Sequence, residues 1–579
     1  VEMRGSGGLQ LTNPQYEILD DEDGETIHTG RIVPVYEKAG SVTPKMQRRL
    51  VHDALQRLPP DLPDALPESV RGRLNLPSRY AALLATHFPP ADVPLEDLNR
   101  FATPAQHRLI FEEAFLFQAG VAARRQALAA EHKTVVPRVD DRIRESARQV
   151  LPFRLTAGQK SALKEIVDDL QRPQPMNRLL QGDVGAGKTI VALLAALVAM
   201  ENGLQVAFMA PTEILAEQHF LTFRRLLRRC DYRVELLTSL QKGREREEVL
   251  ARIASGEAQI VIGTHALIQE AVAFRRLGYA VVDEQHRFGV LQREELRRKG
   301  YEADVLVMTA TPIPRTLALT AYGDLDVSVV DEKPPGRTPV RTALRPASQR
   351  REVVELLRRA VAEGRQAYVV YPLVEESDKL EDVAAATEAA AEWTSLLPGV
   401  RVGLLHGRLK SADKEAAMAA FACGFTQVLV ATTVIEVGVD VPSATLMVIE
   451  HAERYGLAQL HQLRGRVGRG AAESTCVLLA HGRLSEEARS RLEVMTATED
   501  GFAIAERDLE LRGPGDFFGT RQWGIPTLRV ANLLRDRDLL ERAREEALRL
   551  AEEGPLPPAL AAFLEKGGWE RRFSLSRVG

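Results

Sequence analysis

The chain has 579 residues and a mass of 64.0 kDa, which is too much for one hydrophobic core and predicts about three or four domains. Hydrophobic residues make up 45% and charged residues 27%, a composition that excludes a largely disordered or fibrous protein. The net charge of -4 excludes a wholly basic chain, so any contact with nucleic acid must come from a local basic surface. Cys230, Cys423 and Cys476 lie far apart, which favours neither a disulfide framework nor a zinc site. We expect buried free thiols in a reducing cytosol.

The first 33 residues are rich in glycine and then acidic, and they are too few to form a domain alone. Within and just beyond them, the alternating stretch at 26–36 is compatible with a strand. From 34 to 150 the apolar residues recur at helical spacing, most clearly at 48–58 and 107–128, between proline-rich connectors. We therefore predict a helical spacer over 34–150.

Between residues 151 and 335, short apolar runs alternate with helical segments, as in a parallel sheet flanked by helices. The run at 189–200 falls short of the ~20 residues of a membrane span and predicts a buried helix. The same alternation over 336–485 predicts a second α/β domain. The remainder, 486–579, is helical and highly charged. It is broken at 511–524 by LRGPGDFFGTRQWG, whose glycines and proline we expect to prevent a continuing helix.

The segment GDVGAGKT at 182–189 matches the phosphate-loop pattern GxxxxGK[ST] between an apolar run and an apolar helix. In such a loop backbone N–H groups turn toward phosphate oxygens, and the helix N-terminus adds positive potential. Lys188 would then reach the β- and γ-phosphates from a solvent-facing loop and act in catalysis, and Thr189 would ligate Mg²⁺. The alternative is a glycine-rich turn with an incidental lysine. The predicted nucleotide-binding residues of this segment are Gly182, Asp183, Val184, Gly185, Ala186, Gly187, Lys188 and Thr189.

Two adjacent acids, Asp283 and Glu284, follow the apolar run at 279–282. At the end of a strand, one such acid can hold Mg²⁺ through water while its neighbour polarises the attacking water. We assign Asp283 to the nucleotide and its metal, and Glu284 to catalysis. By itself the pair would equally fit two solvated acids on a loop.

About seven motifs, in one order across residues 151–470, resemble those of the superfamily 2 helicases. LPFRLTAGQ resembles the segment that reads adenine, which implies that Phe153 and Gln159 bind the nucleotide. APTEILAEQH and LLTS resemble strand-contacting motifs, and TATPIPRT resembles the coupling motif. ATTVIEVGVDVP resembles the fifth motif, which implies Gly438 and Asp440 as nucleotide-binding residues.

QLHQLRGRVGRG resembles the sixth motif and carries Gln462, Arg466 and Arg469. In phosphoryl transfer the γ-phosphoryl oxygens gain negative charge in the transition state, and an arginine delivered across a cleft stabilises that charge. Arg466 and Arg469 are the candidates for this catalytic role. The alternative is a basic helix face that binds nothing.

Two further segments, at 283–293 and 501–524, resemble the RecG family of branch-migration translocases. The second resembles the TRG segment shared with the transcription-repair coupling factor Mfd, in which a helical hairpin and loop link nucleotide state to DNA movement. The approach to the motor at 28–51 resembles RecG rather than Mfd. Residues 1–33 match only the tail of RecG's OB-like wedge, so we expect either a truncated product or further sequence upstream of Val1.

The resemblance implies an α/β fold with two RecA-like parallel-sheet motor domains, at 151–335 and 336–485, a helical N-terminal spacer, and a C-terminal helical hairpin and loop at 486–579. It implies an ATP- and Mg²⁺-dependent translocase of double-stranded DNA that drives fork regression and Holliday junction branch migration in recombination and repair. Expected partners are duplex and branched DNA and single-stranded-DNA-binding protein, with no membrane. The chain would be a monomer in the cytoplasm, at the nucleoid. The alternatives are an RNA helicase of the same superfamily and a junction-binding protein with a decayed motor.

The segment LRGPGDFFGTRQWG follows the sixth motif, so it is not needed to build the ATP site. We assign Arg512, Arg521 and Gln522 to coupling with DNA, because arginine can contact phosphate and both residue types can bridge a moving loop to a neighbouring domain. The alternative is that the arginines cap helices or pair with Glu506, Asp508 and Glu510.

Overall fold

A computed structural model of the chain divides into two compact units. One unit comprises residues 1–123 and 528–571, and the other comprises residues 124–527 and 572–579. Each unit is described by itself. The residues described are 2–4, 8–10, 27–28, 30–38, 40–129, 132–151, 153–239, 241–283, 295–296, 299, 303–309, 325–332, 334, 338–372, 381–432, 441–468, 470, 472–517, 528–533 and 535–566.

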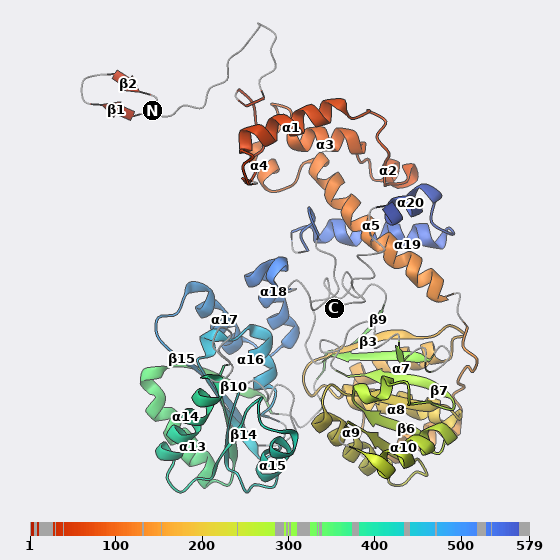
Figure 1. The fold of residues 1–579 in the computed structure, drawn as a ribbon, viewed down its shortest axis with the longest axis vertical. Coiled ribbons are helices and arrows are strands. Elements are labelled where there is room, and N and C mark those ends of the chain that lie inside the picture. Colours follow the sequence, from red (N-terminus) through yellow and green to blue (C-terminus); the bar gives the residue numbers. More distant parts are fainter. Residues whose placement is uncertain are drawn as a thin grey trace. The chain divides into compact units, whose positions relative to one another are not determined.

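The first unit is helical apart from a short hairpin (Figure 1). Thr43 and Ser78 cap two of its helices by accepting backbone N–H bonds, as such residues do at helix starts. The helices expected at 48–58 and 107–128 are confirmed. The elements are β1 (Glu2–Arg4), β2 (Gly8–Gln10), α1 (Pro44–Arg57), α2 (Glu68–Arg73), α3 (Arg79–His87), α4 (Leu95–Asn99), α5 (Pro104–Ala129, whose last turns enter the second unit), α19 (Arg537–Glu552) and α20 (Pro558–Lys566).

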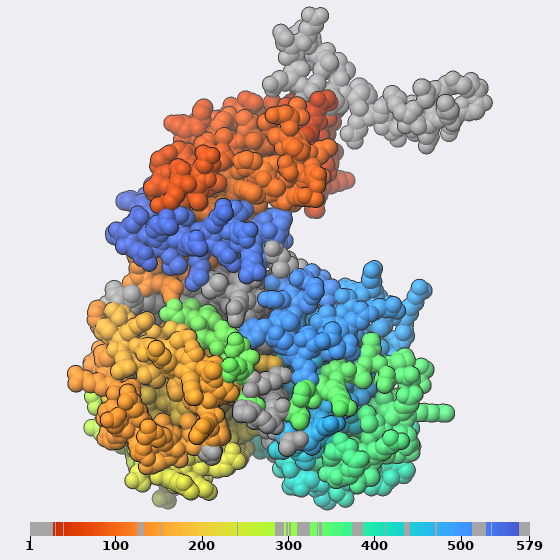
Figure 2. Space-filling view, turned by 180° about the vertical axis from the view of Figure 1, so that it is seen from behind, coloured from red at the N-terminus to blue at the C-terminus, as the bar shows by residue number. Residues whose placement is uncertain are grey.

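Distant parts of the sequence meet in this unit, where the C-terminal helices α19 and α20 lie against the N-terminal helices (Figure 2). Arg73 forms an ion pair with the buried Glu546 at 2.8 Å, and the guanidinium of Arg79 lies 4.8 Å from the ring centroid of Phe563. These contacts explain why a chain segment more than 400 residues downstream completes the helical unit.

The strand considered at 26–36 is not formed in its described part, residues 27–28 and 30–36. Pro34 has no N–H to donate to a ladder, and its carbonyl accepts instead from Nε and a terminal nitrogen of Arg48, at 3.2 and 3.0 Å. The Tyr36 hydroxyl hydrogen-bonds Nδ1 of His87 at 2.7 Å. Side-chain contacts to α1 and α3 therefore hold this stretch in place of strand pairing.

The second unit contains two parallel sheets, as the alternation of apolar runs and helical segments predicts. The first sheet has seven described strands in the order β5-β6-β4-β7-β8-β3-β9, all parallel. Its elements are α6 (Asp141–Val150), α7 (Ala157–Leu170), β3 (Asn177–Gly182), α8 (Lys188–Glu201), β4 (Gln205–Met209), α9 (Glu213–Leu226), β5 (Val234–Leu237), α10 (Gly243–Ser255), β6 (Ile260–Gly263), the 3-10 helix His265–Ile268, β7 (Leu277–Val282), β8 (Asp304–Thr309) and β9 (Asp326–Val330).

The second sheet has six described strands in the order β10-β15-β14-β11-β13-β12, again all parallel. Its elements are β10 (Val340–Pro346), the 3-10 helix Ala347–Gln349, α13 (Arg350–Ala362), β11 (Gln366–Val370), α14 (Glu381–Leu396), β12 (Val402–Leu405), α15 (Ser411–Ala422), β13 (Val428–Ala431), β14 (Ala444–Glu450), the 3-10 helix Ala452–Arg454, α16 (Leu457–Arg464), β15 (Ser474–Ala480), α17 (Glu486–Ala497) and α18 (Gly501–Phe517).

The apolar run at 189–200 forms the buried helix that was predicted. It lies within α8, where every residue from 191 to 200 is buried in the core of the first sheet. Among the described residues, no helix combines the length and apolar character that crossing a membrane would require.

Two expectations from the sequence are wrong. The helix α18 continues through Gly513, Pro514 and Gly515 to Phe517, although proline removes one helical hydrogen bond at a cost of about 3 kcal/mol. Burial of Ile504 and Leu509 earlier in the same helix offsets that local cost. Of the cysteines expected to be buried, Cys476 is buried but Cys423 is exposed, because it is the cap residue that follows the last turn of α15. Burial raises the pKa of the Cys476 thiol to about 12.

Candidate nucleotide-binding site

The predicted phosphate loop joins the carboxyl end of β3 to the amino end of α8. Gly187 is the residue before the helix and has a φ of 86°, in the region that favours glycine. A Cβ at this position would lie 2.3 Å from Nε2 of Gln159, so a side chain would also collide with a neighbour. The strand, glycine-rich loop and helix thus occur in the order that presents backbone N–H groups and the helix N-terminus to an anion.

Lys188 lies in the first turn of α8, and its ammonium group turns back over the loop. Its Nζ donates to the carbonyl oxygens of Gly182 at 2.8 Å and Asp183 at 3.0 Å. The residue is only 8% exposed, although the sequence predicts that it lies on a solvent-facing loop rather than in the core. The loop curls around the side chain, and the ammonium group is thereby held above the backbone that would cradle phosphate.

Gln159 closes the other side of the loop. Thr156 and Gln159 form a reciprocal capping box at the start of α7, and the Gln159 amide also donates to the Ala186 carbonyl at 2.7 Å. The residue is buried and its amide therefore bonds the phosphate loop itself, a contact that the motif alone did not indicate. Phe153, four residues before α7, is 49% exposed and available to pack on a ligand.

Asp283 directly follows β7, the strand whose apolar residues predicted it. Nε2 of His219, on α9, lies 2.9 Å from Oδ2 of Asp283, and both side chains are largely buried. The His219 ring packs on Phe208 with centroids 4.7 Å apart. His219 thus positions the carboxylate. Sequence reasoning missed this role, although the residue ends the motif APTEILAEQH.

These residues fit ATP with Mg²⁺. Thr189 lies next to Lys188 in the first turn of α8 and is half-buried, and Asp283 supplies one carboxylate. No group of three or more His, Cys, Asp or Glu side chains suited to a metal occurs in the part of the chain that the structure describes. Mg²⁺ commonly takes one or two carboxylates together with phosphate oxygens and water, and Asp283 and Thr189 could supply the protein's part of such a set.

The helix α16 of the second sheet reaches the phosphate loop of the first. Nε2 of His461 lies 2.6 Å from Oδ1 of Asp183, and a Cβ at Gly465 would lie 2.9 Å from Val184. Arg466 is half-buried and stands two residues after the end of α16. The structure therefore brings the sixth-motif segment to the same loop that holds Lys188.

Several predicted site residues cannot be placed. Arg512 belongs to α18, but its side chain is outside the description. The following lie outside the described residues altogether: Glu284, Gly438, Asp440, Arg469, Arg521 and Gln522.

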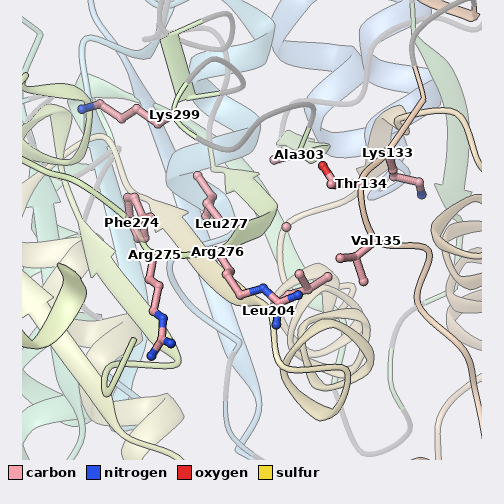
Figure 3. Close-up of a pocket in the computed structure, with 11 residues that line it drawn as sticks. Lys133, Thr134, Val135, Leu204, Phe274, Arg275, Arg276, Leu277, Lys299 and Ala303 are labelled. Atoms are coloured by element: carbon pink, nitrogen blue, oxygen red, sulfur yellow. The ribbon is translucent and has the colours of Figure 1, made fainter. Parts of the chain in front are cut away.

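A separate pocket of about 260 Å³ lies at the opposite edge of the first sheet, beside the amino ends of β4 and β7 (Figure 3). It is lined in part by Leu204, Leu277 and Arg276. The ammonium of Lys133 is paired with Asp304 at 3.0 Å, and that of Lys299 donates to two loop carbonyls. Burial raises the pKa of the Asp304 carboxyl to about 7 despite the lysine. The pocket is thus distinct from the phosphate loop, and its lysines serve structural contacts.

Comparison with known families assigns three successive parts of the chain. Residues 156–320 match the DEAD/DEAH box helicase family, and residues 348–471 match the helicase conserved C-terminal domain. Residues 498–559 match the C-terminal part of domain 3 of the ATP-dependent DNA helicase RecG.

Curated relatives share close to half of their residues with this chain. ATP-dependent DNA helicase RecG of Bacillus subtilis is 47% identical, over 90% of this chain and 75% of the relative. RecG of Escherichia coli K12 is 46% identical, over 95% of this chain and 80% of the relative. The chain belongs to the RecG family. A RecG from Synechocystis is 48% identical over 95% of this chain, which spans 65% of that longer relative.

A solved structure described as RecG bound to a three-way DNA junction has the same fold, with a TM-score of 0.69 and 42% identity. The match covers 88% of this chain and 66% of that RecG. Membership of the RecG family explains why two RecA-like parallel sheets are followed by the charged helices α17 and α18.

Proposed function

We propose that this chain is an ATP-driven motor on double-stranded DNA that remodels branched DNA, driving fork regression and Holliday junction branch migration. The observation that carries the proposal is the meeting of α16 with the phosphate loop, through His461 and Asp183 at 2.6 Å. A composite site between two RecA-like domains makes domain closure depend on nucleotide. The RecG solved with a three-way DNA junction supports branched DNA as the substrate.

ATP would be held by the loop at 182–189, with Mg²⁺ at Thr189 and Asp283. The bound metal would neutralise charge on the β- and γ-phosphates. Lys188 would donate to phosphate oxygens in place of the Gly182 and Asp183 carbonyls. His219 would keep the Asp283 carboxylate oriented, and Glu284 would polarise the attacking water. Gln159 and Phe153 would contact the base, with Gly438 and Asp440 contributing from the second motor domain.

Movement of DNA would be driven from α18, which packs on α16 and α17. After α18 the described residues resume at 528, in the other unit. There the Glu113 carboxylate accepts from the backbone nitrogens of Arg529, Val530 and Ala531 at 2.7, 2.8 and 2.9 Å. A helix that packs on the ATP-site helix α16 is suited to pass domain rotation on to the DNA.

The function is tested by measuring ATP hydrolysis with forked DNA, linear duplex, single-stranded DNA and RNA in parallel. We expect forked and duplex DNA to stimulate turnover more than single-stranded DNA, and RNA to stimulate least. Stronger stimulation by RNA would favour the RNA-helicase alternative, and absence of turnover with every nucleic acid would favour a junction-binding protein without a working motor. The expected setting is a cytoplasmic monomer acting at the nucleoid with single-stranded-DNA-binding protein.

Replacing Arg512 and Gln522 by alanine should separate ATP hydrolysis from DNA movement, because in the sequence these residues follow the motifs of the ATP site and belong to the coupling segment. DNA-stimulated ATP hydrolysis should persist while branch migration fails, both measured on one preparation. Arg507→Ala on the same helix is the matched control, since Arg507 forms an exposed ion pair with Glu510 at 2.7 Å. Parallel loss of both activities, or no change in either, would refute the assignment of Arg512 and Gln522.

A further inference from the structure

The contact between His461 and Asp183 is buried between the two motor domains. Their side chains are 7% and 13% exposed, and Nε2 of His461 lies 2.6 Å from the carboxylate. Oδ1 of Asp183 also accepts from the backbone nitrogen of Val184, the next residue of the phosphate loop, at 2.6 Å. One carboxylate oxygen therefore joins α16 to the loop backbone, and a loop that changes shape around phosphate must move this oxygen or lose a bond.

The other ring nitrogen of the same imidazole contacts Arg464, which lies one turn further along α16. A terminal nitrogen of Arg464 lies 3.0 Å from Nδ1 of His461. Because guanidinium only donates, Nδ1 must accept, and the imidazole proton is assigned to Nε2, where it points at Asp183. Arg464, His461 and Asp183 thus form a row of hydrogen-bonded side chains. Each bond in this row is donated in the same direction, from Arg464 to His461 and from His461 to Asp183.

Arg464 continues the row away from the ATP site. Its other terminal nitrogen donates to the carbonyls of Met495 at 2.9 Å and Thr498 at 2.8 Å. Met495 lies near the end of α17, and Thr498 is its cap residue, three residues before α18 begins. Arg464 is 3% exposed, and its guanidinium donates to carbonyls that a helix C-terminus leaves without helical partners. Burial lowers the pKa of Arg464, yet guanidinium remains charged at neutral pH.

A second contact, independent of the hydrogen bonds, is the close packing of the end of α16 against the phosphate loop. Gly465 caps α16 with a φ of -66°, which any residue can adopt, but a Cβ there would stand 2.9 Å from side-chain atoms of Val184. The close approach therefore depends on the missing side chain rather than on an unusual backbone. Both contacts bear on neighbouring residues of the loop, Asp183 and Val184.

We infer that His461 and Arg464 are positioning residues that transmit the state of the phosphate loop to the junction of α17 and α18. The inference rests on the proposed function and assigns its coupling route to these two side chains, which are distinct from the arginines proposed to act on phosphate. The connection is short, and the two side chains at its centre, His461 and Arg464, are buried, so displacement at Asp183 is carried to Thr498 through directly bonded side chains.

His461→Ala breaks the row at its centre. We expect the junction movement per ATP consumed to fall by roughly tenfold, a larger loss than any fall in ATP hydrolysis with duplex DNA. His461→Gln restores a donor near the position of Nε2 and should recover part of that ratio. His481→Ala is the matched control, since it removes a histidine–carboxylate contact of 2.7 Å, to Glu450, elsewhere in the same domain.

Gly465→Ala tests the route without removing a hydrogen bond or a buried charge. The added methyl group should push α16 from Val184 and lower the movement per ATP, with a melting temperature near that of the unmodified protein. In a double-mutant comparison, His461→Ala with Arg464→Lys should lose no more of the ratio than the worse single variant, as expected for one shared route.

Three results would overturn the inference. They are an unchanged ratio in both His461→Ala and Gly465→Ala, a proportional loss of hydrolysis and movement, and losses from His461 and Arg464 that multiply. Failure of the unmodified protein to hydrolyse ATP with DNA or to move a junction would instead count against the proposed function, so the two failures are distinguishable.

Discussion

Replacing Lys188 by alanine should abolish measurable ATP hydrolysis. The ammonium group is the cation that the loop holds over its own carbonyls, and a single donor aimed at developing charge is worth roughly 10²–10³-fold in rate. Loss of charge neutralisation on the β- and γ-phosphates adds to this. The measurement is steady-state ATP turnover with saturating duplex DNA, beside binding of a non-hydrolysable ATP analogue.

Because Lys188 is buried, its replacement must be separated from a general loss of structure. Alanine removes two hydrogen bonds to carbonyls but also the need to bury a charge, so the melting temperature should change by only a few degrees. Lys160→Ala, at an exposed position on α7, is the matched control and should leave turnover intact. Near-normal turnover by folded Lys188→Ala would refute the assignment of the phosphate loop.

The sheets were predictable from the sequence because parallel strands buried on both faces are continuous apolar runs. The runs that became β4, β6, β7 and β8 each carry three or more consecutive apolar residues. Strand β10, VRTALRP, was not predicted because it is half exposed, and it mixes arginines with apolar residues at one edge of its sheet. The continuation of α18 through Pro514 was missed because local helix penalties were weighed without the burial of the rest of the helix.

For the site, the spacing of residues in the sequence identified the functional residues within each motif. It did not reveal the contacts between different segments of the chain. Lys188, Thr189 and Asp283 could be named because glycine spacing and strand-end acids carry that chemistry. The two histidines that contact carboxylates could not be named in this way. His219 contacts a carboxylate 64 residues away in the sequence, and His461 contacts one 278 residues away. Only the fold brings such pairs together, so their roles had no local signal beyond their place inside motifs.

Replacing Arg469 by alanine, and to a lesser degree Arg466, should slow hydrolysis by roughly 10³-fold or more while nucleotide affinity changes little, because an arginine finger acts on charge present only in the transition state. The bond between His461 and Asp183 supports this role, since it brings the segment that follows α16 to the phosphate loop. The measurement pairs single-turnover hydrolysis with equilibrium binding of a non-hydrolysable analogue. Arg454→Ala, an exposed arginine in the same domain, controls for loss of charge. If affinity and rate fell by equal factors, the arginines would be ground-state contacts, and transition-state stabilisation would have to come from Lys188 and the metal instead.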